Sequence, residues 1–90
     1  MSFCEQQLKV IEKMASLFFP PESIAINLEL QKPELFLSMI EMRTGPAFAA
    51  YMRGRLQTEI ELREAIKMAA INGSSPAQGL MIQFFKESSL

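Results

Sequence analysis

The stretch that decides the fold is residues 19–40, which read FPPESIAINLELQKPELFLSMI. Proline is excluded from a helix interior but fits a first turn, where its missing N–H is not needed. Pro21 and Pro33 therefore each begin a helix, and we expect these two helices over residues 21–29 and 33–43. A short helix, a tight connection and a second helix have the layout of a helix-turn-helix.

Helical spacing of apolar residues continues on both sides of this unit. It predicts a helix over residues 3–17 and two more over 46–71 and 76–87, and no stretch alternates as a strand would. The sequence therefore predicts an all-α fold, a small bundle of about five helices in a single domain, 1–90. The helix-turn-helix-like unit occupies about 20–43, and a C-terminal helical pair occupies about 46–87. The residues expected in the core are Leu8, Ile11, Met14, Ala15, Phe18, Ile24, Ala25, Leu28, Leu35 or Phe36, Met39, Ile40, Ala47, Ala50, Tyr51, Leu62, Ile66 and Ala69. The helix over 76–87 presents Ala77, Leu80, Met81, Phe84 and Phe85 on its apolar side.

Several helix ends carry local markers. Ser2 followed three residues later by Glu5 has the pattern of a capping box. The run NGSSP at 72–76 predicts a left-handed residue at Asn72 or Gly73, and Ser74 or Ser75 can cap the helix that follows. Gly54 lies inside the longest predicted helix, where it marks a bend or a division into two helices.

The composition excludes most catalytic chemistry. The 90 residues include no His, no Asp and a single Cys, so a Ser-His-Asp triad, a Cys-His pair and a His-ligated zinc are excluded. One cysteine cannot form a disulfide framework and is typical of a reducing compartment. No stretch has the length of apolar residues that a membrane span needs, and the N-terminus does not read as a signal peptide. We expect a cytoplasmic, non-enzymatic protein with no catalytic residues, no metal, no cofactor and no membrane contact.

The charge pattern leaves DNA binding open. The net charge is −1, but residues 31–55 carry four basic and two acidic side chains. Because phosphate neutralisation supplies much of DNA affinity, we expect DNA binding to be weak or to depend on oligomerisation. The alternative is that these helices are ordinary bundle elements with solvated charges, and that Tyr51 is a core residue and not a base-stacking one. The candidate DNA-binding residues are Gln31, Lys32, Ser38, Arg43, Arg53 and Arg55.

The apolar content favours a second function. Hydrophobic residues make up 49% of the chain, with 7 Met and 7 Phe, which is more than a monomer of this size easily buries. Methionine also forms adaptable binding surfaces. The sequence therefore predicts a homo-oligomer, and its alternative function is a helical protein-interaction module without DNA binding. The candidate interface residues are Leu37, Met42, Met52, Phe84 and Phe85.

The residues after the helix-turn-helix-like unit follow a recognisable order. A Tyr-x-x-Gly segment comes first, and a helix ending in an Ala-x-x-Gly-Ser-like turn then leads into an apolar helix. Over roughly residues 8–86 the chain thus resembles bacteriophage terminase small subunits and related phage-borne helix-turn-helix proteins. The resemblance implies a non-enzymatic DNA-packaging subunit that binds viral DNA, assembles into a ring and engages a large ATPase–nuclease subunit. The second helix lacks the basic, Asn-rich face typical of DNA readers. The matching positions are Tyr51, Gly54, Leu62, Ala69, Gly73, Ser74 and Ala77.

Overall fold

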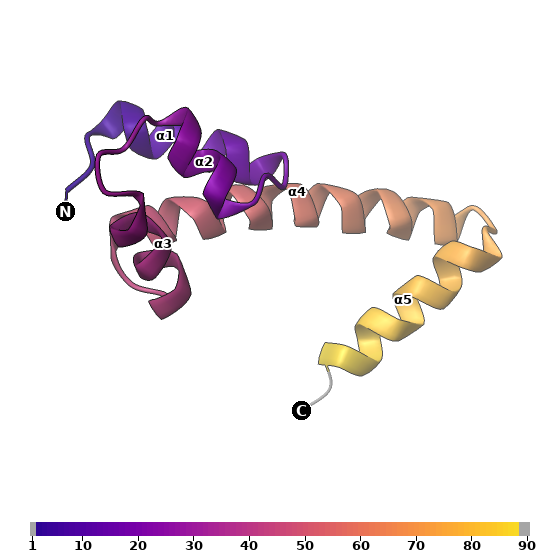
Figure 1. The fold of residues 1–90 in the computed structure, drawn as a ribbon. Helices are drawn as coiled ribbons and strands as arrows, with labels where there is room; N and C mark the ends of the chain where they lie inside the picture. The colour runs from indigo at the N-terminus through magenta and orange to yellow at the C-terminus, as the bar shows by residue number, and fades with distance from the viewer. Residues whose placement is uncertain (1, 89–90) are drawn as a thin grey trace. The chain divides into compact units, whose positions relative to one another are not determined.

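The computed structural model describes residues 2–88, and this part of the chain contains five α-helices and no strand (Figure 1). This confirms the all-α prediction, and each helix begins and ends within two residues of its predicted bounds. None of the described helices combines the length and the apolar character that crossing a bilayer requires. The helices are α1 (Glu5–Ser16), α2 (Pro21–Asn27), α3 (Pro33–Met42), α4 (Gly45–Ile71) and α5 (Ser75–Ser88).

The chain divides into two compact units, and the boundary falls inside α4, between Thr58 and Glu59. The first unit consists of α1, α2, α3 and the first half of α4. The second consists of the rest of α4 and α5. The C-terminal pair predicted over 46–87 is therefore shorter than expected, because the first half of α4 supplies Ala47, Ala50 and Tyr51 to the core of the first unit.

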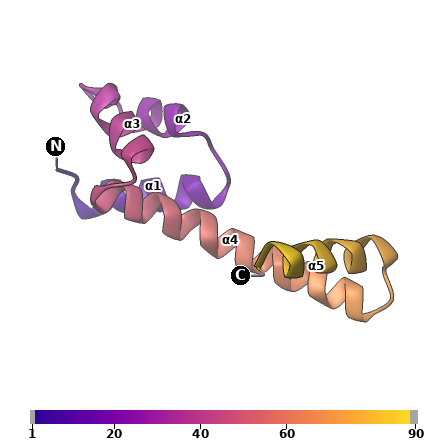
Figure 2. The same ribbon diagram turned by 90° about the horizontal axis from the view of Figure 1, so that it is seen from below.

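The first unit encloses a continuous apolar core. Its largest fully buried side chains are Phe36, Ile11 and Ile24, and Phe3 packs edge-on against Phe36 with ring centroids 5.9 Å apart. Of the two residues that could begin the buried face of α3, Phe36 is enclosed whereas Leu35 is 42% exposed. Helix α2 packs against both α1 and α3, and α1 lies along the first half of α4 (Figures 1 and 2).

Gly54 is the point at which α4 comes close to α1. A Cβ atom at residue 54 would overlap the carbonyl oxygen of Glu12 and lie 3.0 Å from the Cβ of Ala15. One turn further on, the Thr58 hydroxyl donates a hydrogen bond to the carbonyl oxygen of Ser16. The predicted bend or division at Gly54 is therefore wrong: α4 runs unbroken from Gly45 to Ile71, and the glycine allows close packing of two helix backbones.

Four helices end in the same way, with a left-handed residue after the last turn. At the end of α1 the N–H of Phe19 donates to the carbonyl of Met14 over 3.1 Å, and at the end of α4 the N–H of Ser74 donates to that of Ala69 over 3.0 Å. These are the long bonds of Schellman motifs. The left-handed residue is Gly73 after α4, as predicted, with φ +100°. After α1, α2 and α3 it is Phe18, Glu29 and Arg43, each at φ between 54° and 63°.

The N-terminal caps of α1 and α5 overturn one prediction from the sequence and confirm another. The backbone N–H of Cys4 donates to Oε1 of Gln7 over 2.9 Å, so Cys4 is the N-cap of α1 and the predicted box of Ser2 and Glu5 is wrong. At α5 the hydroxyl oxygen of Ser74 accepts the N–H of Ala77 over 3.3 Å, which confirms Ser74 as a cap.

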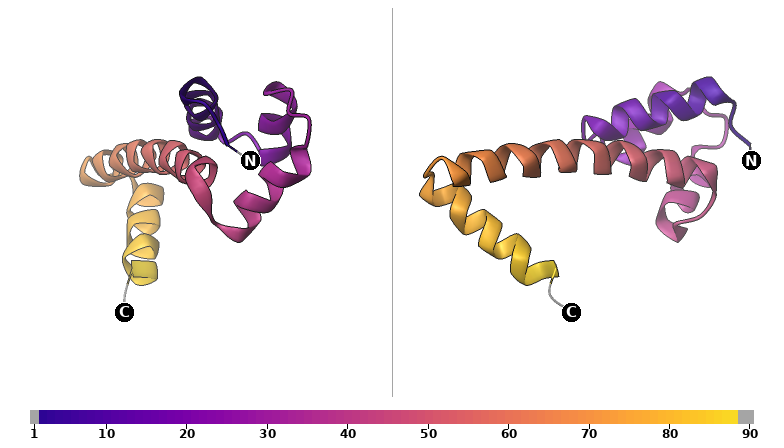
Figure 3. Two further views of the ribbon diagram at one scale, coloured as in Figure 1. Left: turned by 90° about the vertical axis from the view of Figure 1, so that its left-hand side faces the viewer. Right: turned by 180° about the vertical axis from the view of Figure 1, so that it is seen from behind.

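The second unit is a pair of helices joined by a tight turn, and α5 turns back after α4 (Figures 2 and 3). A hydrogen bond and a cation–π contact join the two helices. The Gln78 side-chain amide donates to the carbonyl of Ala70 over 3.1 Å, and the Arg63 guanidinium carbon lies 3.9 Å from the centroid of the Phe84 ring. Among the described residues of this unit only Ala77 is buried. The core assignments of Leu62 and Ala69 in this unit, and of Phe18 in the first unit, are wrong, because these residues are exposed.

Candidate functional site

The helix-turn-helix-like unit places three of its candidate DNA-binding residues in solvent. Helix α2 packs on α3, and Leu30 in the connection is half-buried against the core. Gln31 and Lys32 precede α3 and are exposed, and Ser38 is exposed in its second turn. The start of α3 is therefore accessible, as a recognition helix requires.

The charges along α3 cancel. Lys32 and Arg43 lie just outside its two ends, and both are exposed. Glu34 in the first turn and Glu41 in the last turn are exposed as well. Two carboxylates on the same short helix offset the two cations, so α3 does not present the concentrated positive charge that phosphate binding uses.

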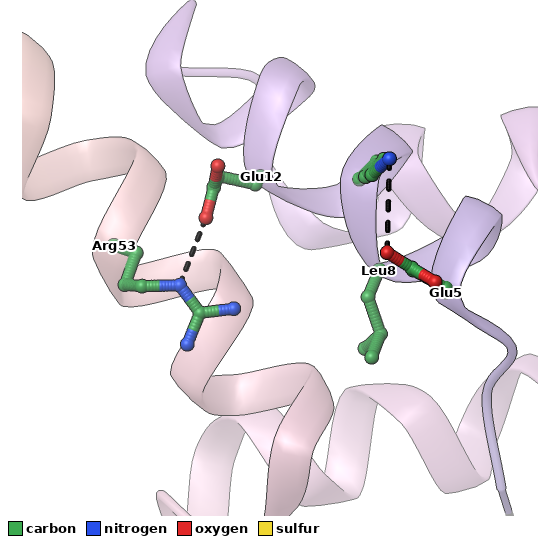
Figure 4. A pocket seen from close by; sticks show the side chains of 5 residues that line it. Glu5, Leu8, Glu12 and Arg53 are labelled. Atoms are coloured by element: carbon green, nitrogen blue, oxygen red, sulfur yellow. Dashed lines mark hydrogen bonds and ion pairs between the residues drawn. The ribbon is translucent and has the colours of Figure 1, made fainter.

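The remaining two candidates, Arg53 and Arg55, are engaged by the protein itself. Arg53 Nε donates to Oε1 of Glu12 over 2.8 Å, which links α4 to α1 (Figure 4). The Arg55 guanidinium lies 5.4 Å from the Phe18 ring centroid and 5.6 Å from that of Tyr51, and it also donates to the Tyr51 hydroxyl over 3.3 Å. Tyr51 is 9% exposed, so it is a core residue and not a platform for a base.

A shallow pocket of about 270 Å³ lies between α1 and α4, beside the Arg53–Glu12 pair (Figure 4). Glu5, Leu8 and Lys9 complete its lining. Lys9 Nζ lies 3.7 Å from Oε1 of Glu5, so the two cations and two carboxylates of the lining pair with one another. The pocket therefore offers a ligand no uncompensated charge. The sequence did not predict it, because Glu12 and Arg53 are far apart along the chain.

The five candidate interface residues have different environments. Leu37 and Met52 are half-buried against the core of the first unit. Met42, the third candidate in that unit, is 71% exposed. In the second unit Phe84 is half-buried beneath Arg63, whereas Phe85 is 75% exposed.

The exposed apolar surface of the second unit is larger than the sequence predicted. Leu62 was expected in the core, Leu80 on the apolar side of its helix and Phe85 at an interface, and the others were left unassigned. Helical spacing shows which residues share a face but not whether a neighbour covers it. The high apolar content was the one indication of this surplus. The exposed large apolar side chains in the described part of the second unit are Ile60, Leu62, Met68, Ile71, Leu80, Ile82 and Phe85.

Comparison with known proteins adds no relative: no family model matches the chain, and no curated protein or solved structure shows significant similarity to it.

Proposed function

We propose that the chain is a non-enzymatic protein-interaction module whose second unit supplies the binding surface. The supporting observation is the contrast, among the described residues of that unit, between one buried residue, Ala77, and seven large apolar side chains that are 41% to 75% exposed. Contiguous exposed apolar surface on a water-soluble fold is typical of protein–protein contact sites. The chain's net charge of −1 fits a protein partner better than a polyanion.

The first unit would act as the stable part of this module. Its core is enclosed, and two of its arginines, Arg53 and Arg55, contact Glu12, Phe18 and Tyr51. A second unit with little buried area gains the most from a partner, since each large apolar side chain removed from water contributes about 1.5–3 kcal/mol.

A photoreactive amino acid placed in α5 tests this function. At position 85 we expect covalent protein adducts in the cells that produce the chain, because Phe85 is the most exposed large apolar side chain of the second unit. Position 83 is the control, since Gln83 is exposed on the polar side of the same helix. Adducts of equal yield at both positions, or at neither, would contradict the proposal.

DNA binding is a second candidate, supported by the accessible start of α3. A helix-turn-helix protein of phage or mobile-element type, like a terminase small subunit, would read DNA through Gln31, Lys32 and Ser38. In such a subunit the second unit would serve ring assembly or contact with the large ATPase–nuclease subunit. In a mobility-shift assay at low salt, Lys32→Ala combined with Arg43→Ala should abolish binding, whereas Lys86→Ala in α5 should not. Unchanged binding by the double variant would remove this surface from consideration.

A further inference from the structure

Four of the seven exposed large apolar residues of the second unit form two strips, one on each helix, beside the contact between the helices. With about 100° of rotation per residue, Ile60 and Ile71 lie within about 20° of each other on α4. They are 57% and 67% exposed. On α5, Ile82 and Phe85 lie about 60° apart and are 57% and 75% exposed.

Both strips lie on the same side of the helical pair. The half-buried or buried residues that face the partner helix are Arg63, Ile66 and Ala70 on α4 and Ala77, Met81 and Phe84 on α5. Around the axis of α4, Ile60 and Ile71 lie next to this contact stripe, on the side toward which the helix turns from one residue to the next. Ile82 and Phe85 lie on the corresponding side of the stripe on α5. Because both helices are right-handed and α5 runs back along α4, these two sides face the same way. We call Ile60, Ile71, Ile82 and Phe85 the apolar face.

We propose that a second copy of this chain covers the apolar face, so that two helical pairs form a closed, two-fold dimer. This inference rests on the proposed function and names its partner. In a two-fold interface the same patch is used twice, so an apolar face meets an apolar face and no surface is left for a further copy. Two pairs of helices packed in this way form a four-helix arrangement, in which each helix has two neighbours.

The small size of the second unit supports this occupant. A helical unit as short as Glu59–Leu90 usually needs a cross-link or association to be stable, and the only cysteine of the chain, Cys4, lies outside it. Two copies packed through the apolar face supply this association, because Ile60, Ile71, Ile82 and Phe85, each 57% to 75% exposed, leave water together.

The charges of the second unit are compatible with self-association. Four carboxylates and three cations are mixed along it, and the cation Arg63 is already paired with Glu59 over 2.9 Å. Two copies therefore meet without strong repulsion. Lys67 lies beside the Ile60–Ile71 strip, where its aliphatic stem can cover apolar surface while the ammonium group stays in water.

Sedimentation or light scattering of the purified chain tests the dimer. We expect a monomer–dimer equilibrium in the wild type between micromolar and millimolar concentrations. Ile60→Ser combined with Phe85→Ser should raise the dimer dissociation constant at least about a hundredfold, since each dimer loses four apolar contacts. Leu62→Ser combined with Leu80→Ser is the matched control, because both residues are exposed, at 49% and 41%, but lie on the opposite side of the helical pair from the apolar face. Helical content by circular dichroism should be the same in all three proteins.

The outcomes separate this inference from the proposed function. A wild type that stays monomeric throughout overturns the second copy as partner, and protein adducts at position 85 would then still support an interaction module with a different partner. A monomer without such adducts overturns both. Equal weakening by Leu62→Ser with Leu80→Ser and by Ile60→Ser with Phe85→Ser overturns the assignment of the face, and an assembly larger than a dimer overturns the closed two-fold interface.

Discussion

The two units of this chain contain nearly the same share of apolar residues and use them differently. In the first, three helices and half of a fourth meet around Phe36, Ile11 and Ile24, which are fully enclosed. In the second, one and a half helices leave most of their large apolar side chains in solvent. A helix has an apolar arc wider than one neighbour can cover. The difference shows that burial depends on the number of neighbours, and each prediction below measures one aspect of it.

The largest contrast should come from one residue type in the two units. Phe36→Ala should destabilise the chain by about 3–5 kcal/mol, because it removes a fully buried ring and leaves a cavity. Phe85→Ala should change stability by less than about 0.5 kcal/mol when unfolding is measured at a protein concentration too low for self-association. Urea unfolding of both variants measures this, and similar losses would mean that the second unit has a core of its own.

Two glycines give the next contrast. Gly54→Ala should cost about 1–3 kcal/mol, since the new methyl group forces α4 away from the backbone of α1. Gly79→Ala in α5 meets no atom within 4 Å, so it should stabilise its helix by up to about 1 kcal/mol. Thermal unfolding monitored by circular dichroism compares the two. A neutral Gly54→Ala would contradict the close helix crossing.

Substitutions of the left-handed residues at two helix ends should change stability by similar amounts in opposite directions. Gly73→Ala should destabilise by about 1 kcal/mol, because φ is +100° there and the cost is purely one of backbone conformation. Arg43→Gly should stabilise by up to about 1 kcal/mol for the same reason, since Arg43 has φ 57°. Equilibrium unfolding of each variant gives the sign, and a loss of stability in Arg43→Gly would show that its side chain makes a contribution larger than the backbone strain.

The smallest effects concern the ion pairs. Double-mutant cycles should give a coupling free energy of about 0.2–1 kcal/mol for the Glu12–Arg53 pair, which joins two helices. For the Glu59–Arg63 pair, which lies within α4, the coupling should be about 0.3–0.5 kcal/mol. Both should weaken with added salt, because all four side chains are at least 39% exposed. A coupling for Glu12–Arg53 no greater than for the local pair would show that the pair adds nothing to the α1–α4 contact.

Much of the local structure could be read from particular residues. Pro21 and Pro33 mark the starts of α2 and α3, and Gly73 and Ser74 mark the turn before α5, because each effect depends on the backbone of a few neighbouring residues. The candidate site was less predictable. Arg53 and Arg55 are basic residues in a basic segment, and only the packed structure brings Glu12 beside one and Phe18 beside the other.

The sequence by itself determined the helices, their ends and the exclusion of His- and Cys-based catalysis, because these depend on residue types and on short-range spacing. Only the tertiary structure decided which apolar faces are covered. The stripe that starts with Ala47 on α4 is buried as far as Tyr51, but Leu62 further along is 49% exposed. Helical spacing is the same in both halves, and the halves differ in the number of helices around them, which is a property of the whole packing arrangement.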